Sequence, residues 1–397
     1  MVSGPDSSTP TGKLQFFAKV RFAPGKAVNP SRQRFHSFMR LRKEGAITRR
    51  RVYLLCMLVG FVLYIRSASD EADRESLLCS IGEPFERTWL RDQLTEFQRV
   101  YDRRPVAHSA SGSNLFHAFA QWCIIRHLRP QFIIESGVML GWGTYMLRQA
   151  AGNSTHIIAI SPDSPAKVAT QRRQKYYIDG GKVSYLCDAK FQDFNTVDWS
   201  MFGLKNKADF SAALVYFDDH QSGYRRLIEA HRAGFVHIMY DDGYPWPGDN
   251  YALKQTCDVD GRILKLKPGA SPAPSKLFPY HDDFSNLKTT ITLSEKKCMY
   301  ADFVRRVEIY YEFPPLWKGD FRGVHVKMME FATQKGLLEA NEAHAFLAQF
   351  QKLKLNYFEE AARYTFFTYV KLTIAPPTDP AGCLKNKPLQ PKYQVVQ

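Results

Sequence analysis

The sequence predicts an α/β protein with a doubly wound, mostly parallel sheet, preceded by a single N-terminal transmembrane helix. Five short apolar runs alternate with helical segments between residues 131 and 240, which is the pattern of parallel βαβ units. These runs are apolar nearly throughout, as strands buried on both faces of a sheet are. A separate apolar run near the N-terminus follows a cluster of arginines and carries no charge of its own.

Residues 1–51 hold most of the positive charge of the chain. They contain 12 Lys and Arg against two acids, which accounts for +10 of the net charge of +15. They are rich in Ser and Pro and show no apolar periodicity, so we expect a disordered basic tail. Because the excess charge lies in this tail and not on the folded body, we expect no nucleic-acid partner.

We expect the apolar segment 52–66 to be a transmembrane signal anchor. Its uncharged part, residues 52–65, would extend about 21 Å as a helix, so snorkelling arginines would have to help it cross a core of roughly 30 Å. The arginines before it and the acidic SASDEADRE after it predict a cytoplasmic tail and a lumenal domain. That topology describes a type II single-pass protein of the Golgi or endoplasmic reticulum. A signal-peptide core or a buried helix would have a similar length.

Three further segments are expected after the anchor. They are a stem over 67–112, an α/β domain over 113–325, and a C-terminal helical extension and tail over 326–397. The apolar segment 307–317 is expected to complete an edge of the sheet.

The seven cysteines are scattered, and no two form a CxxC pair, so a zinc cluster is not expected. The single N-glycosylation sequon, at Asn153, agrees with a lumenal domain. In an oxidising lumen we expect disulfides among four cysteines, with a pairing that the spacing does not reveal: Cys79, Cys257, Cys298 and Cys383.

A glycine-rich turn follows the first apolar run. Glu135 ends the run, and Gly137, Gly141 and Gly143 come directly after it. Glycine permits a tight turn and lets a ligand approach the backbone, and an acid at a strand end can accept hydrogen bonds from an ammonium or a ribose. The spacing matches neither the GxGxxG fingerprint nor a P-loop, so the turn is either a different cofactor loop or a plain βα turn.

Acids follow each of the other four runs. Asp163 after the second run and Asp188 after the third could contact a ribose and a base, or lie in solvated turns. Two acid clusters follow the fourth and fifth runs, where neighbouring parallel strands would bring them together. With no Lys or Arg nearby in the sequence, they predict a hard cation such as Mg²⁺, the alternative being solvated acidic turns. The clusters are Asp218, Asp219 and His220, then Asp241 and Asp242.

The order of these motifs resembles the class I S-adenosylmethionine-dependent methyltransferases. The features are Glu-x-Gly-x-x-x-Gly-x-Gly after the first run, Asp-His after the fourth, and Asp-Asp-x-Tyr-Pro-x-Pro-Gly after the fifth, within residues 110–255. The sequence is most similar to the catechol O-methyltransferase-like group and to macrocin O-methyltransferase and cephalosporin-hydroxylase-like proteins. This resemblance implies a Rossmann-like fold and S-adenosylmethionine as cofactor.

The resemblance also implies two sets of site residues. The set for the methionine and ribose part of the cofactor is Glu135, Gly137, Gly141 and Gly143. The set for a metal ion, Mg²⁺, is Asp219, Asp241 and Asp242, with His220 beside the cofactor.

Three positions depart from the pattern of that family. Ser161 stands where an acid usually follows the second strand, so Asp163 would have to contact the ribose. Ser222 stands where metal-dependent catechol-type enzymes have a lysine as general base. The fourth run ends in Phe-Asp-Asp-His, where many relatives have Asp-Gly-Asp-His.

These features predict a membrane-anchored O-methyltransferase that acts on a glycan or a small hydroxyl-bearing acceptor. His220 is the candidate general base, because an imidazole titrates near neutrality, and Asp219 would help a metal ion to orient the hydroxyl. Two alternatives stay open. One is a Golgi-type glycosyltransferase that uses Asp258-Val-Asp260 to hold a metal-bound sugar nucleotide, and the other is a non-catalytic protein with the methyltransferase fold.

Overall fold

The computed structural model describes residues 81–105, 114–244, 251–257, 277–280, 289–318, 332, 334–353, 355–374 and 383. All of these belong to one compact unit, residues 68–397. The expected basic tail and the expected anchor at 52–66 lie outside the described residues. Within the described part, no helix is long and apolar enough to cross a membrane.

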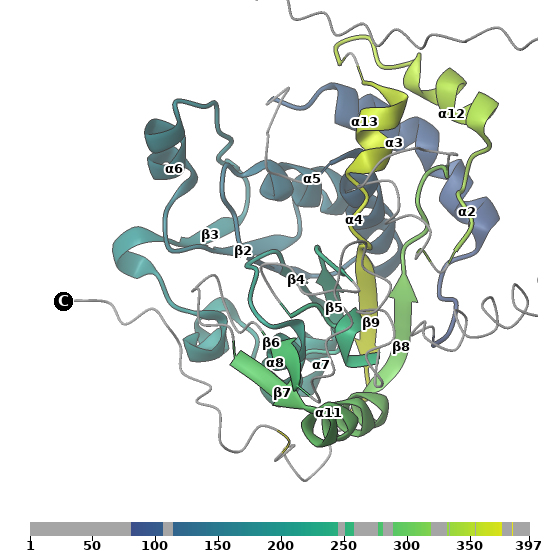
Figure 1. Ribbon diagram of the computed structural model, residues 1–397. Coiled ribbons are helices and arrows are strands. Elements are labelled where there is room, and N and C mark those ends of the chain that lie inside the picture. Colours follow the sequence, from purple (N-terminus) through teal and green to yellow (C-terminus); the bar gives the residue numbers. More distant parts are fainter. Residues whose placement is uncertain are drawn as a thin grey trace, which may run out of the picture. The chain divides into compact units, whose positions relative to one another are not determined.

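A seven-stranded sheet runs through this unit (Figure 1). Every neighbouring pair is parallel except the two pairs that β9 makes with β5 and β8, which are antiparallel. The mostly parallel α/β sheet expected from the sequence is therefore confirmed. In sheet order the strands are β3 (Val183–Leu186), β2 (His156–Ile160), β1 (Phe132–Ser136), β4 (Ala213–Phe217), β5 (His237–Tyr240), β9 (Thr368–Leu372) and β8 (Val307–Glu312).

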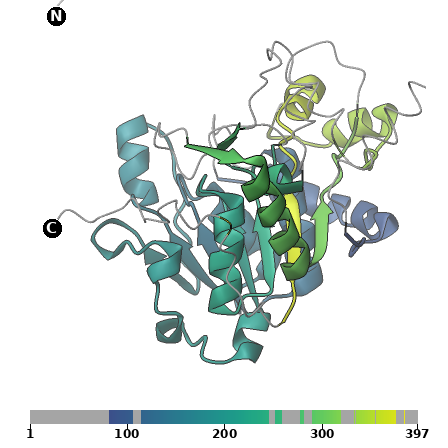
Figure 2. The same cartoon turned by 60° about the horizontal axis from the view of Figure 1, so that its bottom comes forward.

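Helices cover both faces of the sheet (Figure 2). One core layer packs α3, α4 and α5 against the sheet, and a second packs α8 and α11 against the other face. This explains why the residues of β1, β2 and β4 are almost all buried. The described helices are α2 (Arg87–Asp92), α3 (Leu94–Asp102), α4 (Leu115–Leu128), α5 (Trp142–Ala151), α6 (Pro165–Arg172), α7 (Lys207–Ser211), α8 (Gly223–Ala233), α9 (Lys254–Cys257), α11 (Leu293–Arg306), α12 (Ala340–Leu347) and α13 (Tyr357–Ala362). A separate hairpin pairs β6 (Leu277–Tyr280) with β7 (Thr289–Thr292).

Two segments expected to lie outside the α/β domain contribute to its core. Helices α2 and α3 fall in the expected stem, yet Leu90 and Phe97 are completely buried in the core beside α4. The expected helical extension 326–397 does contain α12 and α13, but it also supplies β9, which lies between β5 and β8. The sequence Thr-Tyr-Val-Lys-Leu of β9 has the β-branched and aromatic residues of a strand. The expected edge strand at 307–317 is present as β8.

The strand order reverses between β1 and β4, which is where ligands bind in open α/β sheets, beyond the carboxyl ends of the strands. Ser136, Phe217 and Tyr240 lie in one row across β1, β4 and β5. The hydrogen-bond ladder continues one residue further, because Asp218 N donates to Ser136 O at 2.8 Å and Asp241 N donates to Phe217 O at 3.1 Å. The register therefore sets Asp218 beside Asp241.

A disulfide between Cys298 and Cys383 joins α11 to the C-terminal segment. Cys257 is also disulfide-bonded, whereas Cys123 and Cys187 are buried free thiols. Three of the four cysteines expected in disulfides are therefore bonded, and the fourth lies outside the described residues.

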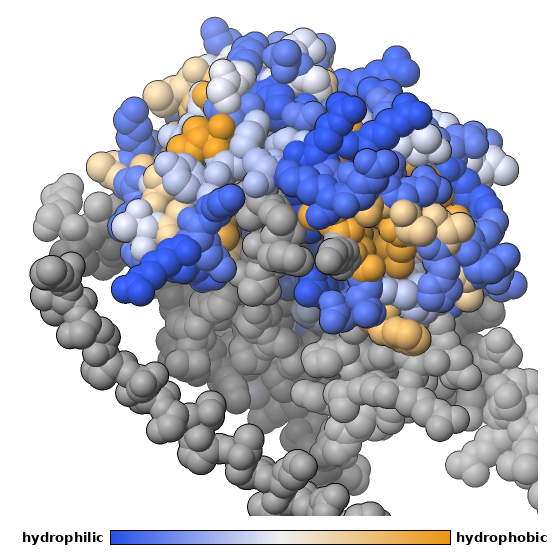
Figure 3. Space-filling model, turned by 90° about the horizontal axis from the view of Figure 1, so that it is seen from above, coloured by the Kyte–Doolittle hydropathy of each residue, from blue (hydrophilic) through white to orange (hydrophobic). Residues whose placement is uncertain are grey.

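The coloured part of the face seen from above is mostly hydrophilic, with hydrophobic areas between the hydrophilic ones (Figure 3). The most exposed large apolar side chains in the described part, Met201, Phe358 and Ile374, come from different elements. Single exposed apolar residues are ordinary on protein surfaces, so we place the functional site at the strand ends instead.

Candidate functional site

Asp218 and Asp219 follow one another at the end of β4 but point to opposite faces of the sheet, as successive residues of a strand do. Tyr216 lies in the core layer of α4 and α5, and its hydroxyl donates to Asp218 Oδ2 at 3.2 Å. Phe217 lies in the core layer of α8, and Asp219 reaches Arg226 of that helix. The two adjacent acids therefore belong to two different groups of side chains.

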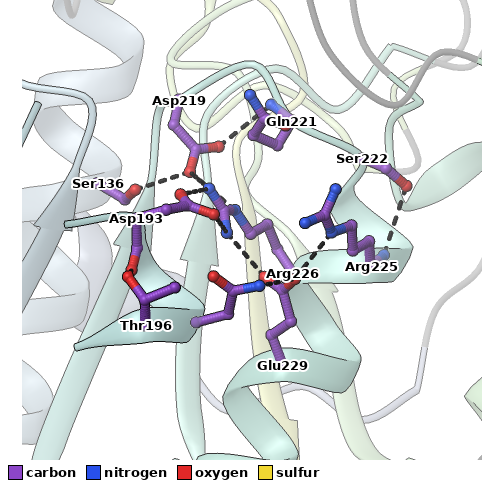
Figure 4. Close-up of polar contacts among 10 residues, drawn as sticks. Ser136, Asp193, Thr196, Asp219, Gln221, Ser222, Arg225, Arg226 and Glu229 are labelled. Carbon is purple, nitrogen blue, oxygen red and sulfur yellow. Dashed lines mark hydrogen bonds and ion pairs between the residues drawn. The ribbon is translucent and has the colours of Figure 1, made fainter. Parts of the chain in front are cut away.

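The first group, here the Arg226 cluster, consists of Arg226, Asp193, Asp219 and Glu229 (Figure 4). Arg226 is 2% exposed and lies 2.7 Å from an oxygen of Asp219, 2.6 Å from Asp193 and 2.7 Å from Glu229. Burial alone would lower the pKa of Arg226, but the three carboxylates raise it well above its usual value. The guanidinium is therefore a fixed cation.

Asp219 is held on all sides within this cluster. Besides Arg226, it accepts hydrogen bonds from Ser136 Oγ at 2.7 Å and from Gln221 N at 3.1 Å. The resemblance implied Asp219 as a metal ligand, and no Lys or Arg close in sequence balances its charge. The structure shows that Arg226, seven residues later on α8, supplies the compensating charge.

The second group, here the acid cluster, consists of Asp218, Asp241, Asp242 and His117. Burial, followed by the charge of Asp241, raises the pKa of Asp218 well above its usual range, and a hydrogen bond joins these two carboxyl groups. Asp241 and Asp242 come together as expected from the sequence, but their partner from the end of β4 is Asp218 and not Asp219. The resemblance to Asp-His motifs pointed to the second acid of the pair, whereas strand alternation selects the first.

His117 reaches the acid cluster from the first turn of α4. Asn114 caps this helix by accepting hydrogen bonds from the backbone N–H groups of Phe116 and His117. The ring of His117 is almost completely buried, and its Nδ1 lies 2.5 Å from Asp241 Oδ1. Its Nε2 contacts the hydroxyl of Thr365. Burial lowers the pKa of His117 although Asp242 and Asp218 act in the opposite direction, which favours the neutral imidazole.

Sequence reasoning missed His117. The segment that forms α4 is mostly apolar in sequence, so nothing in its composition singled out a functional side chain. The available signal was an imidazole in the first turn of a helix whose residues from Leu115 to Ile125 are all buried. A polar ring in such a position must have a polar partner.

His220 lies between two members of the acid cluster. Its backbone has a φ of 54°, a left-handed conformation that is uncommon for a residue with a side chain. Its Nε2 is 3.8 Å from Asp218 Oδ1, and its Nδ1 is 3.9 Å from Asp242 Oδ2. Together with Asp241 these residues line an open hollow. The imidazole expected from the sequence to act at this site is therefore present at the mouth of the hollow.

Glu135 is buried beneath the glycine-rich turn. Thr144 Oγ1 donates to its Oε2 at 2.6 Å, while its Oε1 has no hydrogen-bond partner among the residues that the structure describes. Burial raises the pKa of Glu135 to about 8. Gly143 passes so close that an added Cβ would lie 2.5 Å from Oε1. This carboxyl group therefore has an unused acceptor directly below the turn.

Gly137 and Gly141 allow the turn to pack against the rest of the chain. Both have left-handed backbones, with φ of 99° and 76°. An added Cβ would lie 2.2 Å from Asp218 O at Gly137 and 2.0 Å from Tyr177 O at Gly141. The glycines thus hold the turn between the end of β4 and the segment that follows α6.

Asp163 and Asp188, beyond the ends of β2 and β3, are connected by Lys167. The ammonium of Lys167 lies 2.6 Å from Asp163 Oδ1 and 4.0 Å from Asp188 Oδ1. Ser164 N also donates to Asp188 Oδ1 at 3.2 Å. Both carboxylates remain well exposed on the same edge of the sheet as the glycine-rich turn.

Ser222, which stands where the resemblance expects a lysine, begins α8. Its hydroxyl accepts a hydrogen bond from Arg225 N at 3.4 Å, and its side chain is completely buried. Ser222 therefore caps a helix and offers no base to the hollow. The Asp258-Val-Asp260 motif of the glycosyltransferase alternative lies outside the described residues.

No protein-family model and no curated protein sequence matches the chain. Among solved structures, it is similar to the methyltransferase PaMTH1 of Podospora anserina, bound to SAH, at 16% identity over 53% of this chain and 76% of that chain, with a TM-score of 0.25. It is similar to an O-methyltransferase of Bacillus cereus in complex with SAH at 10% identity (47% and 81% covered, TM-score 0.24). It is also similar to the O-methyltransferase TomG of Streptomyces achromogenes in complex with SAM at 14% identity (48% and 81%, TM-score 0.23). These structures belong to the group that the sequence motifs resemble. At such scores they carry no argument about the site.

Proposed function

We propose that this chain is an S-adenosylmethionine-dependent methyltransferase that transfers a methyl group to the oxygen of a hydroxyl-bearing acceptor. One observation supports the proposal above the others. An acid is presented at the carboxyl end of each of the five consecutive parallel strands, around the point where the strand order reverses. A cofactor with an ammonium, a sulfonium and a ribose suits such an edge, because carboxylates can pair with its cationic groups and accept from its hydroxyls.

The residues around the glycine-rich turn fit this cofactor. Glu135 Oε1 is a buried acceptor that lacks a hydrogen bond within the described part, and the amino group of the methionine moiety is a suitable donor. Asp163 and Asp188 are the acids available for the ribose and the base. When bound, the cofactor supplies a methyl group activated by the sulfonium. The protein contributes the turn that orients it against the end of β4.

His220 is the proposed general base. It lines the hollow beside Asp218 and Asp242, whose carboxyl groups would stabilise an imidazolium once the ring has accepted a proton from the acceptor hydroxyl. Ser222 caps α8, so the base cannot be a side chain at that position. This leaves His220 to remove the proton while the turn aligns the two reactants.

We also propose that the domain works in the lumen of the secretory pathway, anchored by residues 52–66, with a glycan or small hydroxyl compound as acceptor. The Cys298–Cys383 disulfide and the bonded Cys257 support an oxidising compartment. Protease protection of the domain in microsomes would test this, and cleavage of the domain in intact vesicles would contradict it.

Calorimetric titration of the full-length protein with S-adenosylmethionine tests the proposed activity. We expect micromolar binding to the wild type and its loss in Gly137→Ala, because the new Cβ would meet Asp218 O and displace the turn. The matched control is Gly152→Ala, since Gly152 also has a left-handed backbone but has open space around its Cβ position.

His220→Asn should keep cofactor binding and lose methyl transfer by about 10²-fold or more. If the titration showed no binding of S-adenosylmethionine but did show binding of a UDP-sugar, the glycosyltransferase alternative would be favoured.

A further inference from the structure

We infer that the acid cluster binds a divalent transition-metal ion such as Mn²⁺, in preference to Mg²⁺, with His117 as a ligand beside Asp241 and Asp242. The inference deepens the proposed function, because it names the ion of the same site. Its test measures the ion and not methyl transfer, so the two can fail separately.

The spacing of the three side chains suits a single ion. One ligand atom each from His117, Asp241 and Asp242 can be chosen so that all lie within 4.8 Å of one another. Metal–ligand bonds are about 2.0–2.6 Å long, so two ligands of one ion lie at most about 4–5 Å apart. The three residues come from the start of α4 and the end of β5, which are both fixed by the core.

His117 is arranged as a metal-binding histidine. It is 3% exposed, and its Nδ1 faces Asp241 Oδ1 at 2.5 Å while making no hydrogen bond of good geometry to the residues that the structure describes. The other ring nitrogen, Nε2, contacts the hydroxyl of Thr365. Metal-binding histidines commonly use their second nitrogen in this way, because a hydrogen bond there fixes the ring and leaves the first nitrogen free for the ion.

Thr365, which contacts His117, is itself hydrogen-bonded to the residue that follows the Asp241–Asp242 pair. Gly243 N donates to Thr365 O at 2.8 Å, directly after the two aspartates. A Cβ on Gly243 would lie 2.3 Å from Phe366 O, so only glycine allows this approach. A backbone hydrogen bond therefore holds Thr365 next to the Asp241–Asp242 pair, and the side chain of Thr365 contacts His117.

The charges of the cluster also favour an ion. The register of β1, β4 and β5 sets Asp218 beside Asp241, so a third carboxyl group lies next to the proposed ligands. Asp219 is excluded as a ligand, because its oxygens are already occupied by Arg226, Ser136 and Gln221. The ligand set is therefore one imidazole with carboxylates, in place of the three carboxylates that the sequence predicted.

This composition decides which ion is preferred. Mg²⁺ binds oxygen ligands and keeps much of its water, whereas imidazole nitrogen suits the first-row transition metals. Mn²⁺ accepts carboxylates as well as imidazole and is therefore the probe of choice.

The test uses full-length protein stripped of metal by a chelator and titrated calorimetrically with MnCl₂ or MgCl₂. We expect one Mn²⁺ per chain, bound at least about tenfold more tightly than Mg²⁺. Pulsed electron paramagnetic resonance of the Mn²⁺ complex should show coupling to a ¹⁴N nucleus. Equal affinity for the two ions, absence of nitrogen coupling, or no binding of either ion would overturn the inference.

Four variants identify the nitrogen and the carboxylates. His117→Gln should abolish the nitrogen coupling and weaken Mn²⁺ binding at least about tenfold, while His220→Asn should retain the coupling. Asp241→Asn should lose the ion, and Asp219→Asn should keep it. Coupling that disappears in His220→Asn, or binding lost in Asp219→Asn with the fold intact, would contradict the assignment even if His117→Gln did not fold. Titration of the metal-free protein with S-adenosylmethionine tests the proposed function independently.

Discussion

Two groups of acidic side chains lie on either side of the end of β4, and their charges are balanced differently. In the Arg226 cluster, three carboxylates surround one buried guanidinium at 2.6–2.7 Å. In the acid cluster, the partners shown for the three carboxyl groups include imidazoles, other carboxyl groups and the hydroxyl of Tyr216. Adjacent residues, Asp218 and Asp219, thus have different roles. The charges of the Arg226 cluster are balanced by a side chain of the fold itself, whereas the acid cluster is suited to an added cation or to proton transfer.

The largest expected effect comes from removing the guanidinium of the Arg226 cluster. Arg226→Ala would leave Asp193, Asp219 and Glu229 largely buried without their guanidinium, which should lower the free energy of unfolding by about 3–5 kcal/mol. Urea denaturation followed by circular dichroism would measure this. Arg226→Lys, which keeps the charge but not the planar donors, should lose less. A loss below about 1 kcal/mol for Arg226→Ala would mean that the cluster does not support the fold.

The second prediction compares the two adjacent acids by the sign of their effect on stability. In metal-free protein, Asp219→Asn should lower the free energy of unfolding by about 1–3 kcal/mol, because it weakens charged hydrogen bonds to Arg226. Asp218→Asn should leave it unchanged or raise it by about 1 kcal/mol, because it relieves repulsion by Asp241 and Asp242.

Parallel urea titrations of both variants at neutral pH would give the two values. Equal losses in both variants would show that the two groups are balanced in the same way, contrary to the structure.

The third expected effect is a pH dependence on the side of the acid cluster. The pKa of Glu135 is raised from 4.5 to about 8 by burial, so the folded protein binds a proton that the unfolded chain has released. Stability from this group is complete below about pH 4.5 and falls as the pH rises toward 8, by at most about 1.4 kcal/mol per pH unit.

Glu135→Gln carries no ionisable group there and should show a flatter profile than the wild type between pH 5 and 8 in the same urea experiment. Superimposable profiles would show that Glu135 titrates normally in the folded protein.

The sequence predicted the five parallel strands and the edge at which the acids gather, because strand period and strand-end position are local properties. It predicted Asp241 and Asp242 as neighbours for the same reason. It did not separate Asp218 from Asp219, since both are acids and only the register with β1 and β5 decides which one faces Asp241. His117, Thr365 and Arg226 were not found, because their roles depend on tertiary packing of α4, the segment before β9, and α8.

Strand β9 has a consequence for how the protein is made and truncated. It lies between β5 and β8 in the sheet but is the last of the described strands along the chain, so β5 stays an open edge until the ribosome has passed Leu372. The sheet cannot close during synthesis of the first three hundred or so residues, and its completion depends on pairing across a long stretch of chain. A premature stop codon shortly before Thr368 would therefore remove an internal strand of the sheet, leaving a chain prone to aggregate.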